Sequence, residues 1–290
     1  MQRTFEGIKK KDFELKNISL VATKGRVRYF FEPFDLKSLI DVLKFLKKEG
    51  IPFLVVGNSS NILWGDGYFD GAVVTTRKVK SFEIIGNKII KVSCGLRIME
   101  LIRITCNLGL SGVEELSGIP GTIGGALVMN AGAFGKSIGD VVRGVYIFNG
   151  SDIDLISRNG IEFCYRKSSL DGVVVLGAIV ELNRSAPAIV AGKVDAIIRK
   201  RREKFPMGSS LGSVFKNPPG DYAGRLIELA GLKGYRIGSA KVSEKHANFF
   251  ISDRGGCARD YFELVNFVKS EVFEKFGVYL EEEIKYAGVF

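Results

Sequence analysis

The sequence predicts a folded α+β protein that divides into two or three compact units. Three observations support this prediction. The chain has 290 residues, which is longer than most single domains. Hydrophobic residues make up 46% of it, enough for several buried cores. Amphipathic helical segments alternate along it with short apolar strands and glycine-rich turns. No low-complexity tract or internal repeat is visible, so we expect an ordered chain.

Residues 28–76 predict a small β-α-β-β unit. A helix is expected over DLKSLIDVLKFLKKEG, because Asp35 is suited to cap its start, apolar residues recur at helical spacing and Gly50 ends it. Strands are expected at RYFFEP before this helix, at IPFLVV directly after it and at GAVVTT after the next loop. That loop, GNSSNILWGDG, is the first candidate site.

Residues 81–185 predict a second, sheet-rich unit. Its expected strands are IIKVSC, VVRGVYIF and GVVVLGAIVEL, with an amphipathic helix around residues 98–102 that ends at Gly109. A basic stretch, VDAIIRKRREKFP, leads to a third unit with helices near Leu226–Ala230 and Tyr261–Phe276. The second of these ends at Gly277. Its expected buried stripe is Tyr261, Leu264, Val265, Val268 and Val272.

The charge balance favours an anionic partner. The formal net charge is +10, with basic clusters at Lys9–Lys11 and Arg199–Lys204, which suits an anionic small molecule or a nucleic acid. There is no helix-turn-helix, zinc-finger or RNP-like pattern. We therefore favour a small molecule and expect no nucleic-acid partner.

Cysteine usage and the N-terminal segment indicate a cytoplasmic protein. The four cysteines are far apart with no C-x-x-C pair, and His246 is the single histidine, so we expect neither a structural disulfide nor a metal site. The start, MQRTFEGIKKKDFELK, has no apolar core of a signal peptide, and no run of eighteen apolar residues follows. We expect no membrane partner.

The second candidate site is the glycine-rich stretch GIPGTIGGALVMNAGAFGKS at 118–137. Its end nearly matches the P-loop G-x-x-x-x-G-K-[ST], but Asn130 holds the first glycine position, and a turn and strand rather than a helix are expected after Ser137. A G-x-G-x-x-G fingerprint is also absent. Two interpretations stay open on composition: amides that bind a pyrophosphate, or tight turns between buried strands.

The first loop offers similar chemistry through side chains. Gly57 permits close backbone approach, and Asn58, Ser59, Ser60 and Asn61 supply amide and hydroxyl donors for phosphate or ribose. Taken alone, the loop could equally be an Asx or Ser turn. Two donor-rich loops on successive units favour a cleft for a long anionic ligand.

Seven stretches then occur in a familiar order: GNSSNIL, SGIPGTIGGALVMNAGAFG, YRKSS, SLGSVFKNP, AGLKG, VSEKHANF and LEEEIKYAG. Through them the chain resembles the UDP-N-acetylenolpyruvoylglucosamine reductase family, FAD-dependent enzymes of bacterial peptidoglycan synthesis. The similarity runs from about Lys24 to Gly288. The absence of an insertion between Asn183 and Arg199 resembles the shorter, second type of the enzyme. The family implies a role in cell wall formation, cell shape and cell division.

The resemblance implies an FAD-binding fold like that of vanillyl-alcohol oxidase, with a C-terminal α+β substrate-binding domain. We expect one FAD-binding subdomain at residues 1–78, a second at 79–195 and the substrate domain at 196–290. NADPH would reduce the FAD, and flavin N5 would deliver hydride to UDP-N-acetylglucosamine enolpyruvate, giving UDP-N-acetylmuramate. A monomer or weak homo-oligomer is expected. The alternatives are another FAD-dependent oxidoreductase of this fold and a non-catalytic nucleotide-binding protein.

The family pattern implies three catalytic residues. Arg166, in YRKSS, would hold the carboxylate and stabilise the enolate, because its planar fork fits a carboxylate. Ser213, in SLGSVFKNP, would give the proton, with Lys216 as a neighbour that lowers the cost. Glu283, the second glutamate of L-E-x-E, would polarise the enolate. In a strand Glu281 and Glu283 would share one face and Glu282 the other.

The resemblance also implies the binding residues. The first loop departs from the usual G-G-G-S-N by carrying side chains at two glycine positions. His246 is left out, because a lone histidine is more often a buried, hydrogen-bonded residue. The substrate candidates are Lys204 and Asn217, with Arg201 and Tyr222 behind them. The expected FAD contacts are Gly57, Asn58, Ser59, Ser60, Asn61, Gly118, Ile119, Pro120, Gly121, Thr122, Gly124, Gly125 and Asn130.

Overall fold

The computed structural model describes residues 5–290, which form two compact units. Unit 1 contains the described residues up to Lys11, Tyr29–Asn58 and Gly71–Arg201. Unit 2 contains Asp12–Arg28, Ser59–Asp70 and Arg202–Phe290. Among the described residues, buried apolar side chains form two clusters in unit 1 and one in unit 2. The domain boundaries near residues 78 and 195 stay a prediction.

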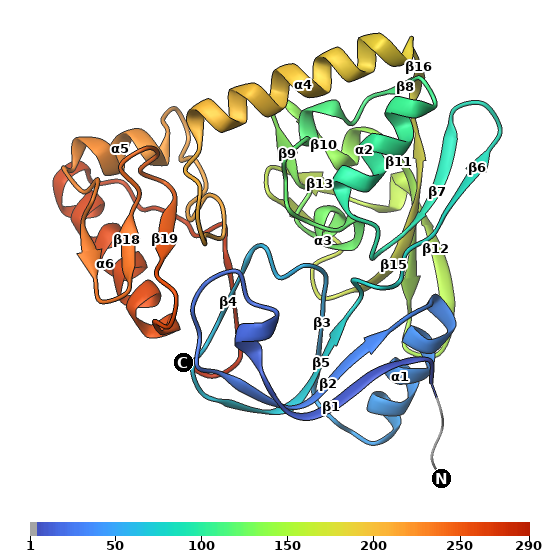
Figure 1. The fold of residues 1–290 in the computed structure, drawn as a ribbon, viewed down its shortest axis with the longest axis horizontal. Coiled ribbons are helices and arrows are strands. Elements are labelled where there is room, and N and C mark those ends of the chain that lie inside the picture. The colour runs from blue at the N-terminus through green and yellow to red at the C-terminus, as the bar shows by residue number, and fades with distance from the viewer. Residues whose placement is uncertain (1–4) are drawn as a thin grey trace. The chain divides into compact units, whose positions relative to one another are not determined.

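The first sheet and its helix lie where the sequence predicts the β-α-β-β unit. The strand order is β1-β2-β5-β3, and β3 and β5 are parallel (Figure 1). The sequence does not predict β1, because the charged residues Lys9–Asp12 lie exposed in it. Charged side chains are common on edge strands, where they oppose pairing with other chains. The bounds are β1 (Gly7–Glu14), β2 (Arg26–Pro33), α1 (Leu36–Lys48), β3 (Phe53–Val56) and β5 (Tyr68–Thr75).

Helix α1 begins and ends at the predicted residues. The carboxylate of Asp35 accepts a hydrogen bond from the Ser38 amide at 2.7 Å, and this contact lowers the pKa of Asp35. The chain leaves the helix through Gly50 at φ +63°, a conformation that glycine adopts without strain. Its buried face includes Leu39, Leu43 and Leu46.

The second sheet is antiparallel throughout, in the order β12-β11-β15-β7-β6. It contains the three strands predicted for this region. Helix α2 (Ile98–Asn107) follows β7 and ends before Gly109 at φ +62°, as predicted. The strand bounds are β6 (Phe82–Ile85), β7 (Ile89–Ser93), β11 (Val142–Phe148), β12 (Ile153–Ser157) and β15 (Val174–Glu181).

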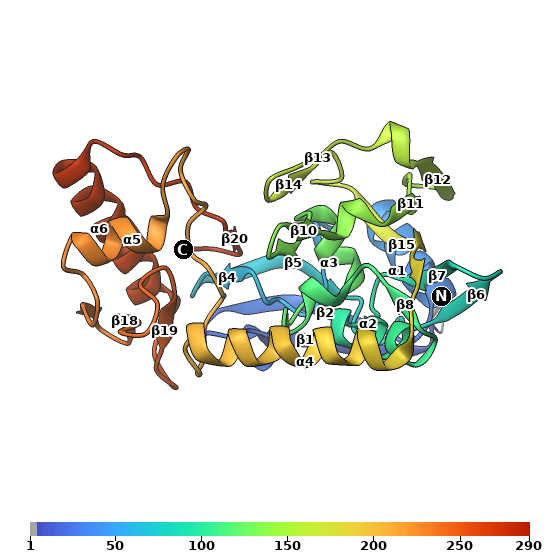
Figure 2. The same cartoon turned by 90° about the horizontal axis from the view of Figure 1, so that it is seen from above.

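A short helix and three two-stranded ribbons complete this part of unit 1. Helix α3 (Ile123–Val128), which the sequence does not predict, contacts β7, β14 and β15 and is labelled in Figure 2. The ribbons are β8 (Leu110–Ser111) with β16 (Asn183–Arg184), β9 (Gly132–Ala133) with β10 (Lys136–Ser137), and β13 (Phe163–Cys164) with β14 (Lys167–Ser168).

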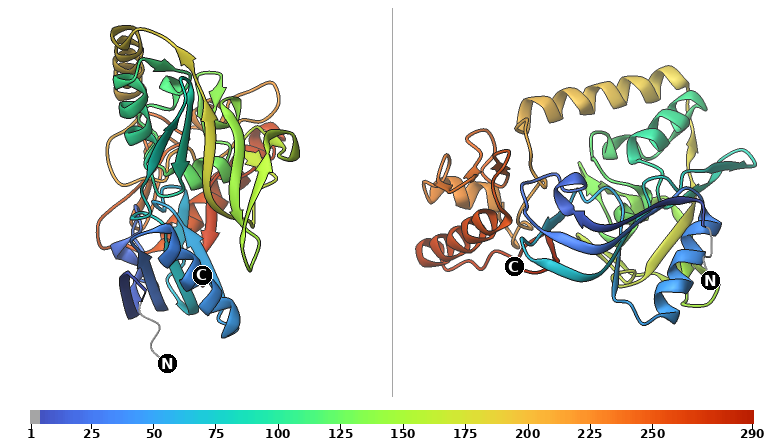
Figure 3. Two further views of the ribbon diagram at one scale, coloured as in Figure 1. Left: turned by 90° about the vertical axis from the view of Figure 1, so that its right-hand side faces the viewer. Right: turned by 60° about the horizontal axis from the view of Figure 1, so that its bottom comes forward.

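The basic stretch before the third predicted unit is part of a long helix. Helix α4 (Pro187–Lys204) has 18 residues and is drawn as one unbroken coil in Figure 3. Pro187 occupies its first position, where a missing amide hydrogen costs nothing. Val190 is its buried residue. Helical periodicity is a weak signal when a helix buries so little, which is why the sequence does not reveal α4.

Unit 2 packs helices α5 (Ala223–Leu229) and α6 (Ala258–Phe276) with an antiparallel sheet of order β17-β18-β19. All five residues of the stripe predicted for α6 are buried, and Gly277 ends it at φ +67°. A parallel pair joins β4, within the first candidate loop, to β20. The strand bounds are β4 (Ile62–Trp64), β17 (Arg236–Ile237), β18 (Ala240–Val242), β19 (Phe250–Ser252) and β20 (Lys285–Ala287).

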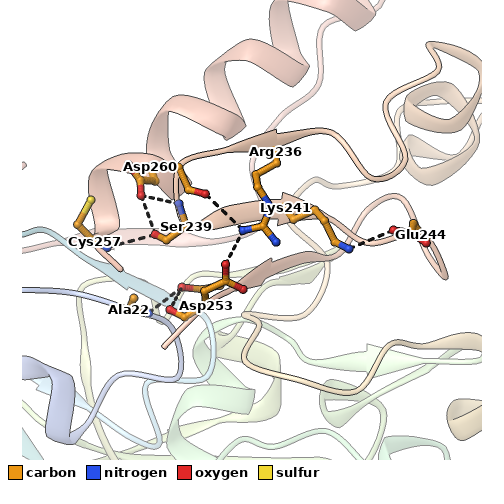
Figure 4. A network of polar contacts seen from close by, with 10 residues as sticks. Ala22, Arg236, Ser239, Lys241, Glu244, Asp253, Cys257 and Asp260 are labelled. Atoms are coloured by element: carbon orange, nitrogen blue, oxygen red, sulfur yellow. Dashed lines mark hydrogen bonds and ion pairs between the residues drawn. The ribbon is translucent and has the colours of Figure 1, made fainter. Parts of the chain in front are cut away.

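A polar network fixes the start of α6 (Figure 4). The Asp260 carboxylate accepts hydrogen bonds from both the amide and the hydroxyl of Ser239, each at 2.7 Å, and these bonds lower the pKa of Asp260. Arg236 pairs with Asp253 beside them. Burial raises the pKa of the Cys257 thiol, which disfavours the thiolate.

The four cysteines are free thiols. Burial raises the pKa of Cys94 to about 12. Within residues 5–290, no cluster of three His, Cys, Asp or Glu side chains could hold a metal ion. None of the helices in that range is both long and apolar enough to cross a bilayer.

Candidate functional site

The two predicted binding loops meet within unit 1. Gly57 directly follows β3, and a Cβ atom built on it would lie 2.1 Å from Thr122 Oγ1. Asn58 Nδ2 donates a hydrogen bond to the Pro120 carbonyl oxygen at 2.6 Å, across 62 positions of sequence. Only glycine fits at position 57, because any side chain would overlap the second loop. The two loops are therefore in contact, and their use as one binding site stays a prediction.

Two buried hydroxyls lie in and next to the segment Gly118–Gly125, which we call the glycine loop, and they fit an anionic cofactor. Among the described residues, Ser117 Oγ and Thr122 Oγ1 are buried and have no hydrogen-bond partner. Leaving a buried polar group unsatisfied costs about 1–3 kcal/mol. Gly118, Pro120 and Gly125 are exposed on the same segment. Phosphate oxygens would accept from such hydroxyls, so the residues present fit the pyrophosphate of FAD.

The Gly-Lys-Ser sequence at the end of the glycine stretch belongs to a short hairpin, with Gly135 in the turn and Lys136–Ser137 in strand β10. Gly135 lies in the left-handed region at φ +80°, and β9 and β10 pair around it. Lys136 is exposed. A single 3-10 turn at Ile138–Asp140 precedes strand β11. The helix that a P-loop needs is therefore missing at this described position.

Arg166 occupies a strained hairpin turn between β13 and β14. Its φ is +55°, a conformation that costs a residue other than glycine about 1–2 kcal/mol. Its guanidinium lies 5.1 Å from the centre of the Tyr165 ring. Strain of this kind is retained where the structure around it enforces the conformation, and it concentrates at functional sites.

Asn130 anchors that hairpin. Its Nδ2 donates to the Cys164 carbonyl oxygen at 2.8 Å, and its Oδ1 accepts from the Gly139 amide at 3.2 Å. From the other strand, Ser168 Oγ donates to the Val128 carbonyl oxygen at 2.8 Å. Asn130 is buried and itself has φ +42°. Its amide therefore supports the Arg166 turn from behind, a role that the sequence did not suggest.

Arg201 lies against the glycine loop. A Cβ built on Gly118 would be 2.8 Å from Arg201 Nε, so the guanidinium covers this glycine. Burial and the positive charge of Arg166 both lower the pKa of Arg201. Two guanidinium groups held near each other attract an anion. Arg201 and Lys204, which the sequence grouped together, both lie in the last turn of α4.

Ser213 and Glu283 lie on neighbouring segments of unit 2. On one side, Ser213 forms a bridge with Phe249, and the Val214 amide donates to the Asn248 carbonyl oxygen at 2.9 Å. On the other side, the Glu283 amide donates to the Val214 carbonyl oxygen at 2.7 Å. These backbone bonds join the segment of Ser213 to the segment of Glu283, with Glu283 bonded to Val214, the residue after Ser213.

The three consecutive glutamates have different partners. Glu281 forms an ion pair with Lys216, and Glu282 forms one with Lys269 at 2.7 Å. The Glu283 carbonyl oxygen accepts from Asn61 Nδ2 at 2.9 Å. The sequence assigned Asn61 to the cofactor, whereas its side chain holds the backbone of Glu283.

The remaining substrate candidates lie in unit 2. Asn217 Oδ1 accepts from the Ala223 amide at 3.2 Å, at the start of α5. Tyr222, the residue before that helix, is 67% exposed, and Lys204 ends α4 in an exposed position. An exposed tyrosine and lysine are suited to contact a ligand that arrives from solvent.

His246 is a packing residue, as expected for a lone histidine. Its ring lies 5.3 Å from that of Phe205 and 5.0 Å from that of Phe249, measured between centroids. Its Nδ1 accepts from the Asn248 amide at 3.3 Å. Burial lowers the pKa of His246.

Comparisons with known proteins first define the class. Residues 27–152 match a family model described as an FAD binding domain, which makes the chain a flavoprotein. Residues 203–287 match the model of the UDP-N-acetylenolpyruvoylglucosamine reductase C-terminal domain. We call the two loops that meet at Gly57–Asn58 and Gly118–Gly125 the cofactor cradle. The first match contains both loops of this cradle, and the second contains the segments of Ser213 and Glu283.

The relatives then give the family. A UDP-N-acetylenolpyruvoylglucosamine reductase of Caldicellulosiruptor bescii is 42% identical, over 97% of this chain and 91% of that protein. The protein of this name from Aquifex aeolicus is 38% identical, over 95% and 94%. The crystal structure of the Thermus caldophilus reductase has a TM-score of 0.83 at 29% identity, covering 98% of this chain and 99% of that one. The chain belongs to the UDP-N-acetylenolpyruvoylglucosamine reductase family, whose members are FAD-dependent oxidoreductases that use NADPH.

Proposed function

We propose that this chain reduces UDP-N-acetylglucosamine enolpyruvate to UDP-N-acetylmuramate in the cytoplasm, with electrons from NADPH. FAD, which the loops around Gly57 and Gly118 would hold, would supply the redox chemistry that passes hydride from NADPH to the enolpyruvyl double bond. One carbon of that bond gains the hydride and the other gains a proton, so the protein must hold the carboxylate, stabilise the enolate and donate one proton. The observation that carries this proposal is the backbone hydrogen bond from Glu283 to Val214, which joins the segment of Glu283 to the segment that carries Ser213.

Arg166 holds the substrate carboxylate in this proposal. A guanidinium presents paired N–H donors that match both carboxylate oxygens. Arg201 adds a second positive charge near that of Arg166. The two charges interact, since the charge of Arg166, together with burial, lowers the pKa of Arg201. A bound carboxylate offsets the repulsion between the two cations and stabilises the negative charge that grows as hydride arrives.

Ser213 Oγ donates the proton to the substrate carbon. A serine hydroxyl is a weak acid, so a neighbouring positive charge lowers the cost of forming the alkoxide. Lys216 is three residues away, and its ammonium is held by Glu281. Gly212, at φ +81°, lets the chain turn directly before the serine.

Glu283 polarises the developing enolate. The bond from Asn61 Nδ2 to its carbonyl oxygen and the bond from its own amide to Val214 fix its backbone on both sides. A fixed backbone sets the point from which the side chain extends, which favours catalysis by a positioned group. Asn61 acts through Glu283 and is a positioning residue.

Lys204, Asn217 and Tyr222 bind the UDP moiety in this proposal. The bond from the Ala223 amide to Asn217 Oδ1 orients the side-chain amide so that Nδ2 serves as a donor to phosphate or sugar. Lys204 supplies the compact positive charge suited to a diphosphate. The exposed ring of Tyr222 is available to stack on a base or sugar.

The absorption spectrum of the purified protein tests the proposal first, followed by NADPH oxidation with and without the enolpyruvyl sugar. The expected result is a flavin spectrum and oxidation that depends on the sugar. Flavin bands with no response to the sugar would indicate a different FAD-dependent oxidoreductase. A protein that stays colourless after FAD is added would contradict the proposal and favour a nucleotide-binding role.

A further inference from the structure

We infer that Asn58 is a positioning residue that assembles the cofactor cradle before FAD arrives, by holding the two binding loops together. The inference rests on the proposed use of FAD. Asn58 Nδ2 bonds to the Pro120 carbonyl oxygen at 2.6 Å, and both residues belong to unit 1. The contact is made by protein groups alone, so it is available to the cofactor-free protein.

The ends of the glycine loop are tied to the rest of the second sheet region. The Gly118 amide lies 3.0 Å from Met99 Sδ, and the Ile98 amide donates to the Gly121 carbonyl oxygen at 3.1 Å. These contacts hold the loop to α2 on either side of Pro120. Asn58 holds Pro120 itself against the first loop.

The two loops are also in close contact at Gly57, next to Asn58. Gly57 leaves no room for a Cβ beside Thr122 Oγ1, so the loops can touch here only because position 57 is glycine. The same Thr122 hydroxyl is buried with no partner among the described residues. A bond that keeps this hydroxyl in the cradle reduces the ordering that FAD must impose when it binds.

The residue after Asn58 makes the bond more important. Ser59 is buried and has φ +51°, a conformation that is unfavourable for any residue except glycine. A loop with this strain tends to relax to another conformation unless a contact opposes it. The Asn58 bond opposes that relaxation on the unit 1 side of the turn.

Asn58→Ala tests the inference in the full chain, with Asn17→Ala as the matched control. Asn17 Nδ2 also bonds a backbone carbonyl, that of Glu14, at 3.0 Å, but it lies in unit 2 and outside the cradle. FAD affinity is measured by titration at a temperature well below unfolding. Hydrogen exchange of the peptide covering residues 116–125 is measured without FAD.

We expect Asn58→Ala to weaken FAD binding about fivefold, because one hydrogen bond is lost. We also expect faster hydrogen exchange of the 116–125 peptide. Asn17→Ala should change neither quantity. A merely structural role would lower the melting temperature while leaving FAD affinity unchanged, and this result would overturn the inference. Unchanged exchange in Asn58→Ala would overturn it as well. If the wild-type protein binds no FAD, the proposed function fails, and the exchange measurement alone still decides whether Asn58 holds the loops together.

Discussion

The cofactor cradle of unit 1 and the Ser213–Glu283 segments of unit 2 are built in opposite ways. The cradle combines residues in the left-handed region, a glycine that touches the opposite loop and two buried hydroxyls without partners among the described residues. The segments that carry Ser213 and Glu283, the proposed catalytic residues, are joined by backbone hydrogen bonds. The cradle therefore leaves hydroxyls available to a ligand, whereas the two segments of unit 2 are held together by the protein's own backbone. Variants in the two regions should consequently fail in different ways.

The largest effect is expected at Glu283. Glu283→Gln should lower the rate of sugar reduction about 10²- to 10⁴-fold, the range for loss of a positioned acid-base group, without weakening FAD binding. Steady-state kinetics and an FAD titration measure the two quantities. Glu282→Gln is the matched control, because Glu282 is paired with Lys269, and it should stay within about threefold of wild type. Equal losses in both variants would contradict the assignment of Glu283.

Replacing Arg166 by glycine should lower the rate of sugar reduction without lowering the stability of the protein. Arg166→Gly removes the strain of φ +55° and should leave the unfolding free energy unchanged or raise it by up to about 1 kcal/mol. Sugar reduction should fall about 10²-fold or more, because the carboxylate loses its partner. Arg166→Lys keeps a charge and the strain, and should not be stabilised. Urea unfolding and turnover measure both; a destabilised Arg166→Gly would mean that the turn is not strained.

Gly57 should affect the cradle alone. Gly57→Ala places a methyl group 2.1 Å from Thr122 Oγ1, so the loops must separate and FAD binding should weaken about 10-fold or more. The Thr122 hydroxyl is itself an expected FAD contact, so the single variant Thr122→Ala is the reference for the double variant. Because Thr122→Ala removes the clashing oxygen, adding Gly57→Ala to it should cost much less affinity than adding Gly57→Ala to the wild type. Gly192→Ala, in α4 with open space around it, is the control and should bind FAD normally. An equal loss from Gly57→Ala in both backgrounds would show that the clash is not the cause.

A smaller, pH-dependent effect on stability is expected at Glu114, four residues before Gly118. Burial opposes its ionisation, but hydrogen bonds from the Ser111 hydroxyl and the Gly112 amide, with Lys193, lower its pKa overall. A pKa lowered by folding contributes stability that is present above the unfolded pKa and is lost as pH falls through the folded value. Glu114→Gln should cost about 1–3 kcal/mol at neutral pH and flatten the acid limb of the stability curve.

Thermal unfolding between pH 3 and 7 checks this prediction, with the neighbouring Glu115→Gln as control. The Glu115 variant should keep the pH dependence of wild type. If both variants lose stability equally at every pH, protonation of Glu114 is not the cause of the loss of stability at low pH.

The sequence predicted best where a signal is local. Helix α1 follows from Asp35 and Gly50 at its ends, and α6 follows from an apolar stripe that is buried throughout. Helix α4 was missed because it buries so little of its surface, and the charged edge strand β1 gives no apolar alternation. In each case the element buries few side chains, so its apolar residues do not recur at helical or strand spacing.

The candidate site was predicted as a set of residues but not as an arrangement. Nothing local indicates that Asn58 bonds Pro120, that Asn61 holds Glu283 or that Asn130 supports the Arg166 hairpin. These are contacts between side chains and distant backbone, which depend on the tertiary fold. The tolerance of Arg166 for a left-handed turn is likewise imposed from outside the turn, by the strands that anchor it.

The most direct test of the account follows the two half-reactions of Ser213→Ala separately by rapid mixing. Reduction of the bound flavin by NADPH, seen as bleaching of its absorption, should proceed at close to the wild-type rate. Reoxidation by the enolpyruvyl sugar should slow about 10²-fold or more, because the proton donor is missing. Equal slowing of both half-reactions, or no slowing of the second, would contradict the assignment of Ser213 as the proton donor.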